Sequence, residues 1–379
     1  MYRVPLNAVK PGMKVAKGIY TSDGQILINA GVTLKPRYIE HLRKLGIAAI
    51  YVEDNLAADV VADDIVDDAT RLEATKTVRE FFLKTQQSGN GSSIMTDRKL
   101  QQTVNDIIDD LLSKKDLMVN LQDIRTMDDY TFGHSVNVCI LALVTGIALG
   151  FSRTQLNHLG MGALMHDIGK LKIPDSIMNK PGKLTEEEFA IMQQHPKFGF
   201  EILRRQDDVS LLSAHMALEH HERFDGAGYP NQLAKDDIHL FSRICSVADV
   251  FDAVTADRVY RKAFAPHEAY ELLAASGGSH FDYKVVSVFL RNIAAYPVGT
   301  WVELNTGEIG IVIDTKPGFA TRPKIRLEFW PGEVREPIFP PQEINLAAEL
   351  DRLIVRVVPR EEIEQITSPI LKVGGNRVK

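Results

Sequence analysis

Apolar residues recur at helical spacing through the middle of the chain, which predicts a bundle of helices there. The strongest stretches are 138–149, 154–167, 185–195, 212–221 and 241–257. Thr185 followed by three glutamates is typical of a helix start, and Pro174 cannot continue the helix that precedes it. We therefore expect an all-helical domain over residues 126–296.

The first 55 residues have a different pattern and predict a small α+β module. The turn sequence Asp23-Gly24 lies between two short apolar runs, which is typical of a β-hairpin. Pro36 opens a helical stretch that ends at Gly46, and a strand is expected over 47–52. Nothing in this module indicates catalysis.

Residues 56–125 predict a helical connector and a candidate dimerisation element. Helical spacing occurs at 72–83 and at 104–112, and the polar, glycine-containing stretch 86–93 separates the two. Acidic residues concentrate between positions 53 and 68, which is typical of a solvated face.

Residues 297–379 return to strand spacing and predict a small β-barrel-like domain. A hairpin is expected around Asn305-Thr306-Gly307, with further strands at 324–329 and 353–358. Trp301 and Trp330 are interpreted as core or interface residues, not as a platform for base stacking. The fold class is therefore multidomain and mainly α.

The composition indicates a globular protein, with 45% hydrophobic and 25% charged residues. A net charge of −6 argues against a partner that is polymeric nucleic acid. Cys139 and Cys245 lie in apolar stretches and are expected to be buried thiols. The longest apolar run, 138–151, falls short of the ~20 residues that span a bilayer, so we expect no membrane partner and a cytoplasmic location.

A set of imidazoles and carboxylates within 116 positions is the strongest chemical signal in the chain. A solitary His-Asp or His-His pair carries little information, but the whole set exceeds what one tetrahedral metal site uses, which indicates two ions. These ligand types suit Fe, Mn, Zn or Ni. Lys170 follows His166 and Asp167 at a spacing that places all three on one helical face. We therefore interpret Lys170 as a partner for phosphate. The set comprises His134, His166, Asp167, His195, His220, His221 and Asp249.

Four separated motifs resemble the HD-GYP family, the cyclic-dinucleotide phosphodiesterase branch of the HD metal-hydrolase superfamily. They are Asp129–Ser135, the HD motif His166–Lys170 with its continuation to Pro174, the GYP motif His220–Pro230, and the helix from Val247 through Arg261. The likeness covers roughly residues 126–295. It implies an HD-type helical bundle that hydrolyses cyclic di-GMP to linear pGpG, with further hydrolysis to GMP left open. It also implies two divalent ions, of which Fe and Mn are favoured.

The resemblance also implies roles for individual residues. One ion would be held by His134, His166 and Asp249, the other by His195, His220 and His221, with Asp167 common to both. Lys170 would contact phosphate and the leaving oxygen. The remaining substrate contacts would be Tyr229, Asp252, Arg258 and Arg261, and the loop that presents Tyr229 could equally dock a protein partner. Members that hold three metals carry Glu where this chain has Tyr130, so two ions are favoured.

Several alternatives stay open at this point. The substrate could be another cyclic dinucleotide, such as cyclic GMP-AMP. The chain could be a non-catalytic dinucleotide receptor, although that class would show a broken ligand set. A di-iron oxygenase would show paired Glu-x-x-His motifs, which the relevant helices lack. The metal, a homodimer, and any partner or input of the N-terminal module are not decided by the sequence.

Overall fold

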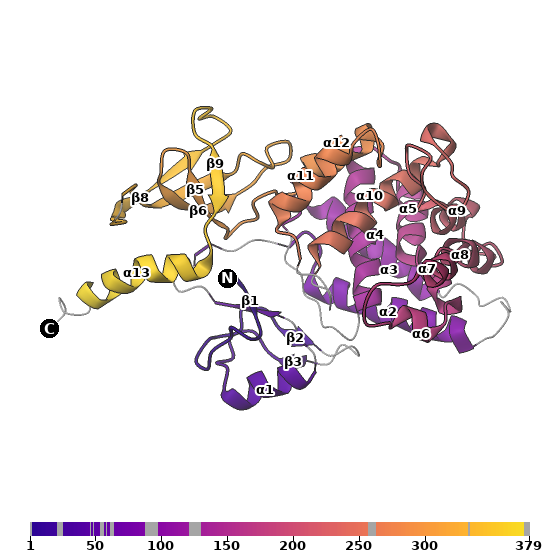
Figure 1. Cartoon of the computed structure of the whole chain (residues 1–379), viewed down its shortest axis with the longest axis horizontal. Coiled ribbons are helices and arrows are strands. Elements are labelled where there is room, and N and C mark those ends of the chain that lie inside the picture. Colours follow the sequence, from indigo (N-terminus) through magenta and orange to yellow (C-terminus); the bar gives the residue numbers. More distant parts are fainter. Residues whose placement is uncertain are drawn as a thin grey trace.

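The computed structural model describes residues 2–20, 26–45, 47, 49–53, 57, 59–60, 64–87, 98–120, 130–256, 263–332 and 334–374. Figure 1 shows a large helical bundle, a smaller sheet domain, and a small N-terminal module beside them. The predicted class is confirmed: the chain is mostly helical, with an α+β segment before the bundle and an antiparallel sheet after it.

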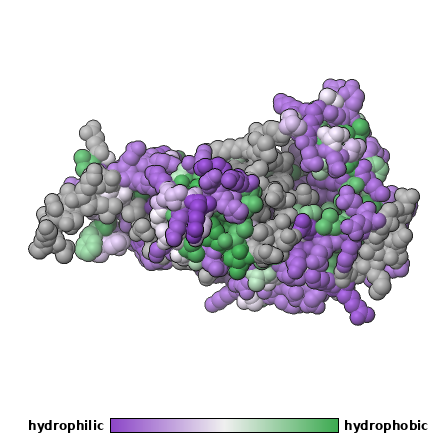
Figure 2. All heavy atoms as spheres, turned by 90° about the horizontal axis from the view of Figure 1, so that it is seen from below, coloured by the Kyte–Doolittle hydropathy of each residue, from purple (hydrophilic) through white to green (hydrophobic). Residues whose placement is uncertain are grey.

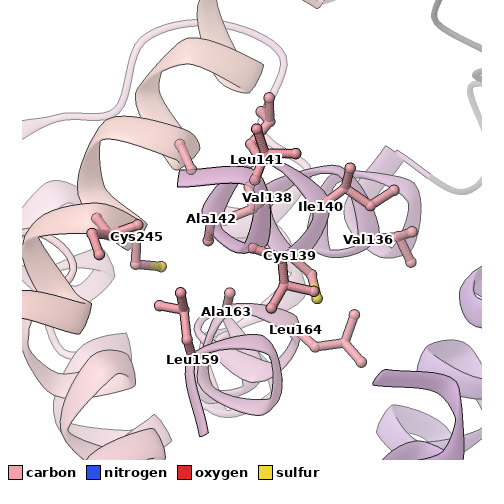
Figure 3. Packing of buried hydrophobic residues seen from close by; sticks show 14 of the residues in the cluster. Val136, Val138, Cys139, Ile140, Leu141, Ala142, Leu159, Ala163, Leu164 and Cys245 are labelled. Atoms are coloured by element: carbon pink, nitrogen blue, oxygen red, sulfur yellow. The ribbon is translucent and has the colours of Figure 1, made fainter. Parts of the chain in front are cut away.

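The helical bundle is built around helix α4 (Tyr130–Ala148), which packs against α5 (Arg153–Met165) and α10 (Leu240–Thr255). Figure 3 shows Cys139 and Ala142 on the side of α4 that faces Leu159 and Ala163 of α5. The bundle also contains η2 (Ile168–Lys172), α6 (Asp175–Met178), α7 (Glu186–Met192), α8 (His195–Leu203), α9 (Leu211–Glu219), η3 (Lys235–Asp237), α11 (Pro266–Ser276) and α12 (Tyr283–Arg291).

Both cysteines lie in this core, as the sequence predicts. Cys139 on α4 and Cys245 on α10 are free thiols with no exposed surface (Figure 3). Burial raises the pKa of both thiols, because the charged thiolate is poorly solvated there. They are therefore structural residues without nucleophilic character.

The two predicted connector helices share the core of the bundle. Helices α2 (Asp68–Gln87) and α3 (Arg98–Ser113) bury apolar residues in the same cluster as α4 and α5. Phe82 of α2 meets Phe132 of α4 edge to face, with ring centroids 5.6 Å apart. Residues 121–129, where the sequence predicts the domain boundary, lie outside the described residues, so that boundary stays a prediction.

The N-terminal module contains β1 (Tyr2–Pro5), β2 (Ile19–Tyr20), β3 (Ile26–Ile28), α1 (Pro36–Lys44) and β4 (Ala49–Val52). Strands β2 and β3 pair antiparallel, as expected for the hairpin, while its turn residues lie outside the described part of the chain. Strand β1, which the sequence pattern did not predict, pairs antiparallel with β4. Ile39 and Leu42 of α1 close a small separate core.

A chain of polar contacts joins this module to the bundle. Lys17 Nζ lies 3.3 Å from Asp64 Oδ2, and Arg71 Nη2 lies 3.3 Å from Asp64 Oδ1. Arg71 Nη1 donates to Asn137 Oδ1 on α4 at 2.7 Å. The acidic segment is thus not simply a solvated face, since Asp64 is largely buried here and Asp59 pairs with Arg326 of the C-terminal domain.

The C-terminal domain is a five-stranded antiparallel sheet in the order β8-β7-β6-β5-β9. The strands are β5 (Trp301–Leu304), β6 (Ile309–Asp314), β7 (Lys324–Phe329), β8 (Pro337–Asn345) and β9 (Ile354–Val357). An apolar cluster covers each face of the sheet. One of the two clusters includes Ile363 of helix α13 (Arg360–Gly374). Trp301 is buried in that cluster, as predicted, whereas Trp330 is 41% exposed.

The surface is mostly hydrophilic in the view from below, with a hydrophobic area near its middle (Figure 2). Among the helices in the described ranges, none combines the length and the apolar character needed to cross a bilayer.

Candidate metal centre

Asp167 lies where helix α5 gives way to the 3₁₀ helix η2. The sequence predicted that His166, Asp167 and Lys170 share a face of one α-helix, which is wrong: α5 ends at Met165, and His166 and Asp167 form the junction. Lys170 still reaches Asp167, because the tighter 3₁₀ turn brings residues three apart onto one side. Its Nζ lies 2.5 Å from Asp167 Oδ2.

The two oxygens of Asp167 point to two different groups of histidines. Oδ2 lies 3.4 Å from Nε2 of His166 and 3.8 Å from Nε2 of His134. Oδ1 lies 3.5 Å from Nε2 of His195 and 3.8 Å from Nε2 of His220. A single buried carboxylate therefore stands between two sets of potential ligands.

Asp249 on α10 joins the first set. Its Oδ1 lies 3.1 Å from His134 Nε2 and 4.0 Å from His166 Nε2. We call these three residues the His134 group. His221 completes the second set, because its ligand atom lies within 4.8 Å of those of His195 and His220. We call those three the His195 group.

Three of the imidazoles are oriented by backbone carbonyls. Nδ1 of His166 lies 2.7 Å from Ala163 O, that of His195 lies 2.7 Å from Met192 O, and that of His220 lies 3.0 Å from Ala217 O. A carbonyl oxygen only accepts, so each Nδ1 carries the proton and each Nε2 presents a lone pair to the interior. Metal-binding histidines are commonly held in this way.

Several inward atoms lack the partner that burial demands. His166 Nε2 and Asp167 Oδ1 are buried without a hydrogen bond. The Nε2 atoms of His195 and His220 face each other at 3.2 Å, although each ring already carries its proton on Nδ1. Opposed lone pairs and an orphaned carboxylate oxygen are unfavourable in a dry interior unless a cation lies between them. The residues fit a divalent metal ion.

Burial keeps the imidazoles of the His195 group neutral, while the Asp167 carboxylate stays charged. Burial lowers the pKa of His195 to about 4 and that of His221 to about 3, so both rings keep their lone pairs at neutral pH. Burial alone would raise the pKa of Asp167, but the positive charge of Lys170 and the neighbouring His166 hold it well below its usual range. Metal ions bind these deprotonated forms.

His134 differs from the other rings because it lies between two carboxylates. Burial alone would lower its pKa, but Asp249 and Asp252 raise it to about 9. Asp252 Oδ2 accepts a hydrogen bond from His134 Nδ1 at 2.6 Å and has no exposed surface. Asp252 therefore orients His134 from behind, and its contact with substrate stays a prediction.

We expect the metal-free protein to be most stable near neutral pH. Between about pH 4 and 6.5, the unfolded chain binds protons on His195 and His221 that the folded chain does not, so stability falls as the pH falls. Between 6.5 and about 9 the folded chain keeps a proton on His134 that the unfolded chain releases, so stability also falls as the pH rises. Urea unfolding of protein freed of metal by a chelator, at pH 5, 7 and 9, measures the free energy of unfolding. A free energy of unfolding that still rises from pH 7 to 9 would contradict the prediction.

Replacing Asp252 by Asn is expected to weaken metal binding by 10- to 100-fold, because the group that orients a metal-binding histidine loses its charge. Calorimetric titration of the metal-free protein with Mn²⁺ measures the affinity for the metal. Asp237→Asn in η3 is the matched control, since that carboxylate is exposed. Equal affinities for Asp252→Asn and the control would show that Asp252 does not position a ligand.

Close backbone packing sets the position of the His195 group. A Cβ atom on Gly169 would overlap the carbonyl oxygen of His195 and the amide nitrogen of Gly199, so only glycine lets η2 lie this near to α8. The sequence placed His195 in the helix that starts at Glu186, which is wrong. That helix ends at Met192 and His195 is the first residue of α8, with Pro196 in its first turn.

The loop that follows the His-His pair lies against the metal centre. The ring of Tyr229 stacks on His221, with centroids 4.8 Å apart and planes 29° apart. Glu222, which is buried, accepts hydrogen bonds from the backbone amides of Asn231 and Leu233 and so fixes the path of the loop. Arg258 and Arg261 lie outside the described residues, as does the side chain of Tyr130.

Sequence reasoning named all seven candidate ligands but missed the contacts by which Asp252 and Glu222 support the site. Asp252 follows Asp249 by three residues on α10, a spacing that predicts a shared face but not a contact with His134. Glu222 directly follows the His-His pair, and its role depends on backbone amides that come nine and eleven residues later. Neither contact can be read from local spacing.

Comparison with protein families matches residues 106–285 to the HD domain and residues 301–366 to the KOW domain associated with the HD domain. The chain is 36% identical over 273 residues to a cyclic di-GMP phosphodiesterase of Pseudomonas aeruginosa, covering 69% of this chain and 65% of that protein. It is 44% identical over 147 residues to a cyclic di-GMP phosphodiesterase response regulator of Xanthomonas campestris, covering 38% of this chain and 39% of that protein.

A 3'3'-cGAMP-specific phosphodiesterase of Vibrio cholerae is 36% identical over 193 residues, covering 50% of this chain and 37% of that protein. The chain thus spans less than two thirds of the length of each of these relatives. Among solved structures, an HDG"Y"P protein from Bdellovibrio bacteriovorus aligns with a TM-score of 0.50 at 16% identity, covering 76% of this chain and 98% of that chain. This likeness supports the fold.

Proposed function

Because residues 106–285 of this chain are an HD domain that carries the sequence Gly228-Tyr229-Pro230, we propose that the protein is a metal-dependent phosphodiesterase that hydrolyses cyclic di-GMP to linear pGpG. The observation that carries the proposal is the position of Asp167, whose two oxygens point to separate groups of inward-facing imidazoles. The names of the Pseudomonas and Xanthomonas relatives support the choice of substrate.

The proposed centre holds two divalent ions, with Fe or Mn favoured and Zn or Ni as alternatives. The His134 group would hold one ion and the His195 group the other, with Asp167 as the ligand common to both. When bound, a pair of such ions polarises phosphate oxygens and makes a water molecule a strong nucleophile near neutral pH. The protein contributes the neutral imidazoles of the His195 group, a charged carboxylate and a largely dry setting for that chemistry.

Lys170 is proposed to act on the phosphate. Its ammonium group lies beside Asp167 and its side chain is 28% exposed, so it adjoins the metal centre and is also reached by solvent. A positive charge there stabilises the extra negative charge that develops on the phosphate oxygens, and its N–H groups can donate to the leaving oxygen.

Hydrolysis of cyclic GMP-AMP is a second candidate, because similar proteins of Vibrio cholerae carry the name of phosphodiesterases specific for that dinucleotide. Both substrates place a phosphodiester at the same centre, so the candidates differ only in how the second base is recognised. A homodimer, a protein partner and the cytoplasmic location stay predictions.

The proposal is tested by elemental analysis of anaerobically purified protein together with hydrolysis of cyclic di-GMP, cyclic GMP-AMP and cyclic di-AMP. We expect close to two equivalents of Fe or Mn and fastest loss of cyclic di-GMP, with pGpG as the product. Fastest loss of cyclic GMP-AMP would select the second candidate. Tight binding of the dinucleotides by fully metal-loaded protein without turnover would identify a receptor. It would overturn the proposal that the protein is a phosphodiesterase.

A further inference from the structure

Helix α7 lies against the metal centre at two points. The carbonyl of Met192, its last residue, accepts the hydrogen bond that orients His195, at 2.7 Å. Phe189 meets Tyr229 edge to face, with ring centroids 6.3 Å apart and planes 78° apart. Since Tyr229 stacks on His221, a continuous series of rings runs from a candidate metal ligand outward to Phe189.

Helix α7 does not owe its position to burial of its own side chains. None of its residues is buried, and Phe189 and Ile191 are 46% and 42% exposed. The start of the helix is instead stabilised by a capping box between Thr185 and Glu188. Lys180, in the preceding loop, adds an ion pair, with its Nζ 2.5 Å from Glu188 Oε2. An aromatic ring that stays exposed beside a polar centre is therefore available to a ligand.

We propose that Phe189 is a base-stacking residue that binds one nucleobase of the substrate. This inference rests on the proposed function and adds a recognition element to the same site. A cyclic dinucleotide carries a purine close to each of its phosphodiesters, so a phosphate at the metal centre brings a base into the surroundings of the centre, where Phe189 of α7 contacts Tyr229. Tyr229 already has His221 stacked on it, whereas the ring of Phe189 is half exposed.

The chemistry of stacking defines what Phe189 contributes. Every base offers a π face, so an aromatic side chain contributes affinity without distinguishing guanine from adenine. Phe189 should therefore serve cyclic di-GMP and cyclic GMP-AMP equally, and the choice between them must come from hydrogen-bonding groups elsewhere in the site.

The test is steady-state kinetics of Phe189→Ala on metal-loaded, full-length protein with cyclic di-GMP. We expect KM to rise about tenfold, in line with the loss of one stacked base, with kcat changed by less than about twofold and metal content unchanged. Phe189→Trp should keep KM near that of the wild type. Ile191→Ala is the matched control, because Ile191 is comparably exposed on the same helix but has no ring.

Each outcome decides the inference. An unchanged KM in Phe189→Ala, or an equal rise in Ile191→Ala, would overturn it. Loss of metal in Phe189→Ala would also overturn it, since the ring would then act by supporting His221 through Tyr229. A wild-type protein that hydrolyses no cyclic dinucleotide would overturn the proposed function itself and this inference with it. An active wild type with an indifferent Phe189→Ala would overturn the inference alone.

Discussion

Replacing Asp167 by Asn or Ala is expected to abolish hydrolysis and to lower metal content, while the helical fold persists. The carboxylate lies between the two histidine groups, and its two oxygens are proposed to serve both ions. Asparagine keeps the size of the side chain but has no negative charge and only one oxygen, so it cannot bridge. Loss of bridging removes the chemistry that depends on a metal pair. Elemental analysis, circular dichroism and turnover of cyclic di-GMP measure the three parts of this result.

Asp175→Asn provides the matched control for Asp167. It removes an exposed carboxylate from the first turn of α6, only eight positions further along the chain. The control should retain full activity and metal. Full hydrolysis by Asp167→Asn would refute the two-ion mechanism, whereas loss of helical signal would show that the carboxylate is needed for folding.

Replacing Lys170 by Met is expected to lower kcat by 10²- to 10⁴-fold, the range for loss of a positioned acid–base group. Metal content should remain close to that of the wild type, because the ammonium group is a neighbour of Asp167 and not a ligand. Methionine retains the length and apolar stem of lysine, so the comparison isolates the charge. Turnover under substrate saturation and elemental analysis on the same preparation separate the two effects.

Lys172→Met is the control for Lys170, since Lys172 lies in the same 3₁₀ helix with its side chain exposed. It should behave like the wild type. If Lys170→Met loses its metal, the proposed role is wrong, and the lysine instead stabilises the charged form of Asp167 on which metal binding depends.

The candidate ligands were predictable from sequence because imidazoles and carboxylates have a strong chemical identity as metal ligands. Three of them, His166, His195 and His220, also lie at helix ends. What sequence could not supply was the connection between distant segments. The contact between Asp252 and His134 joins residues 118 positions apart and arises only when α10 packs on α4. The 3₁₀ conformation of η2 likewise depends on its packing against α8, which Gly169 permits.

Strand β8 was missed for a related reason. Its three prolines, Pro337, Pro340 and Pro341, argue against a central strand, because proline has no N–H to give to a sheet. The strand lies at one end of the sheet order, where such a loss is tolerated. Whether a strand will be central or peripheral is a property of the assembled sheet, which local composition does not reveal.

The ion pairs that join the N-terminal module to the bundle have a practical consequence for truncated forms of the protein. Asn137, at the end of that polar chain, lies three residues after His134 on α4. Cutting away the module removes Lys17, while Arg71 stays beside Asp64. The charge around Arg71, which donates a hydrogen bond to Asn137 of α4, then changes. A fragment without the module would therefore have different contacts beside the helix that carries His134. Kinetic measurements on such a fragment should be compared with those on the 379-residue chain.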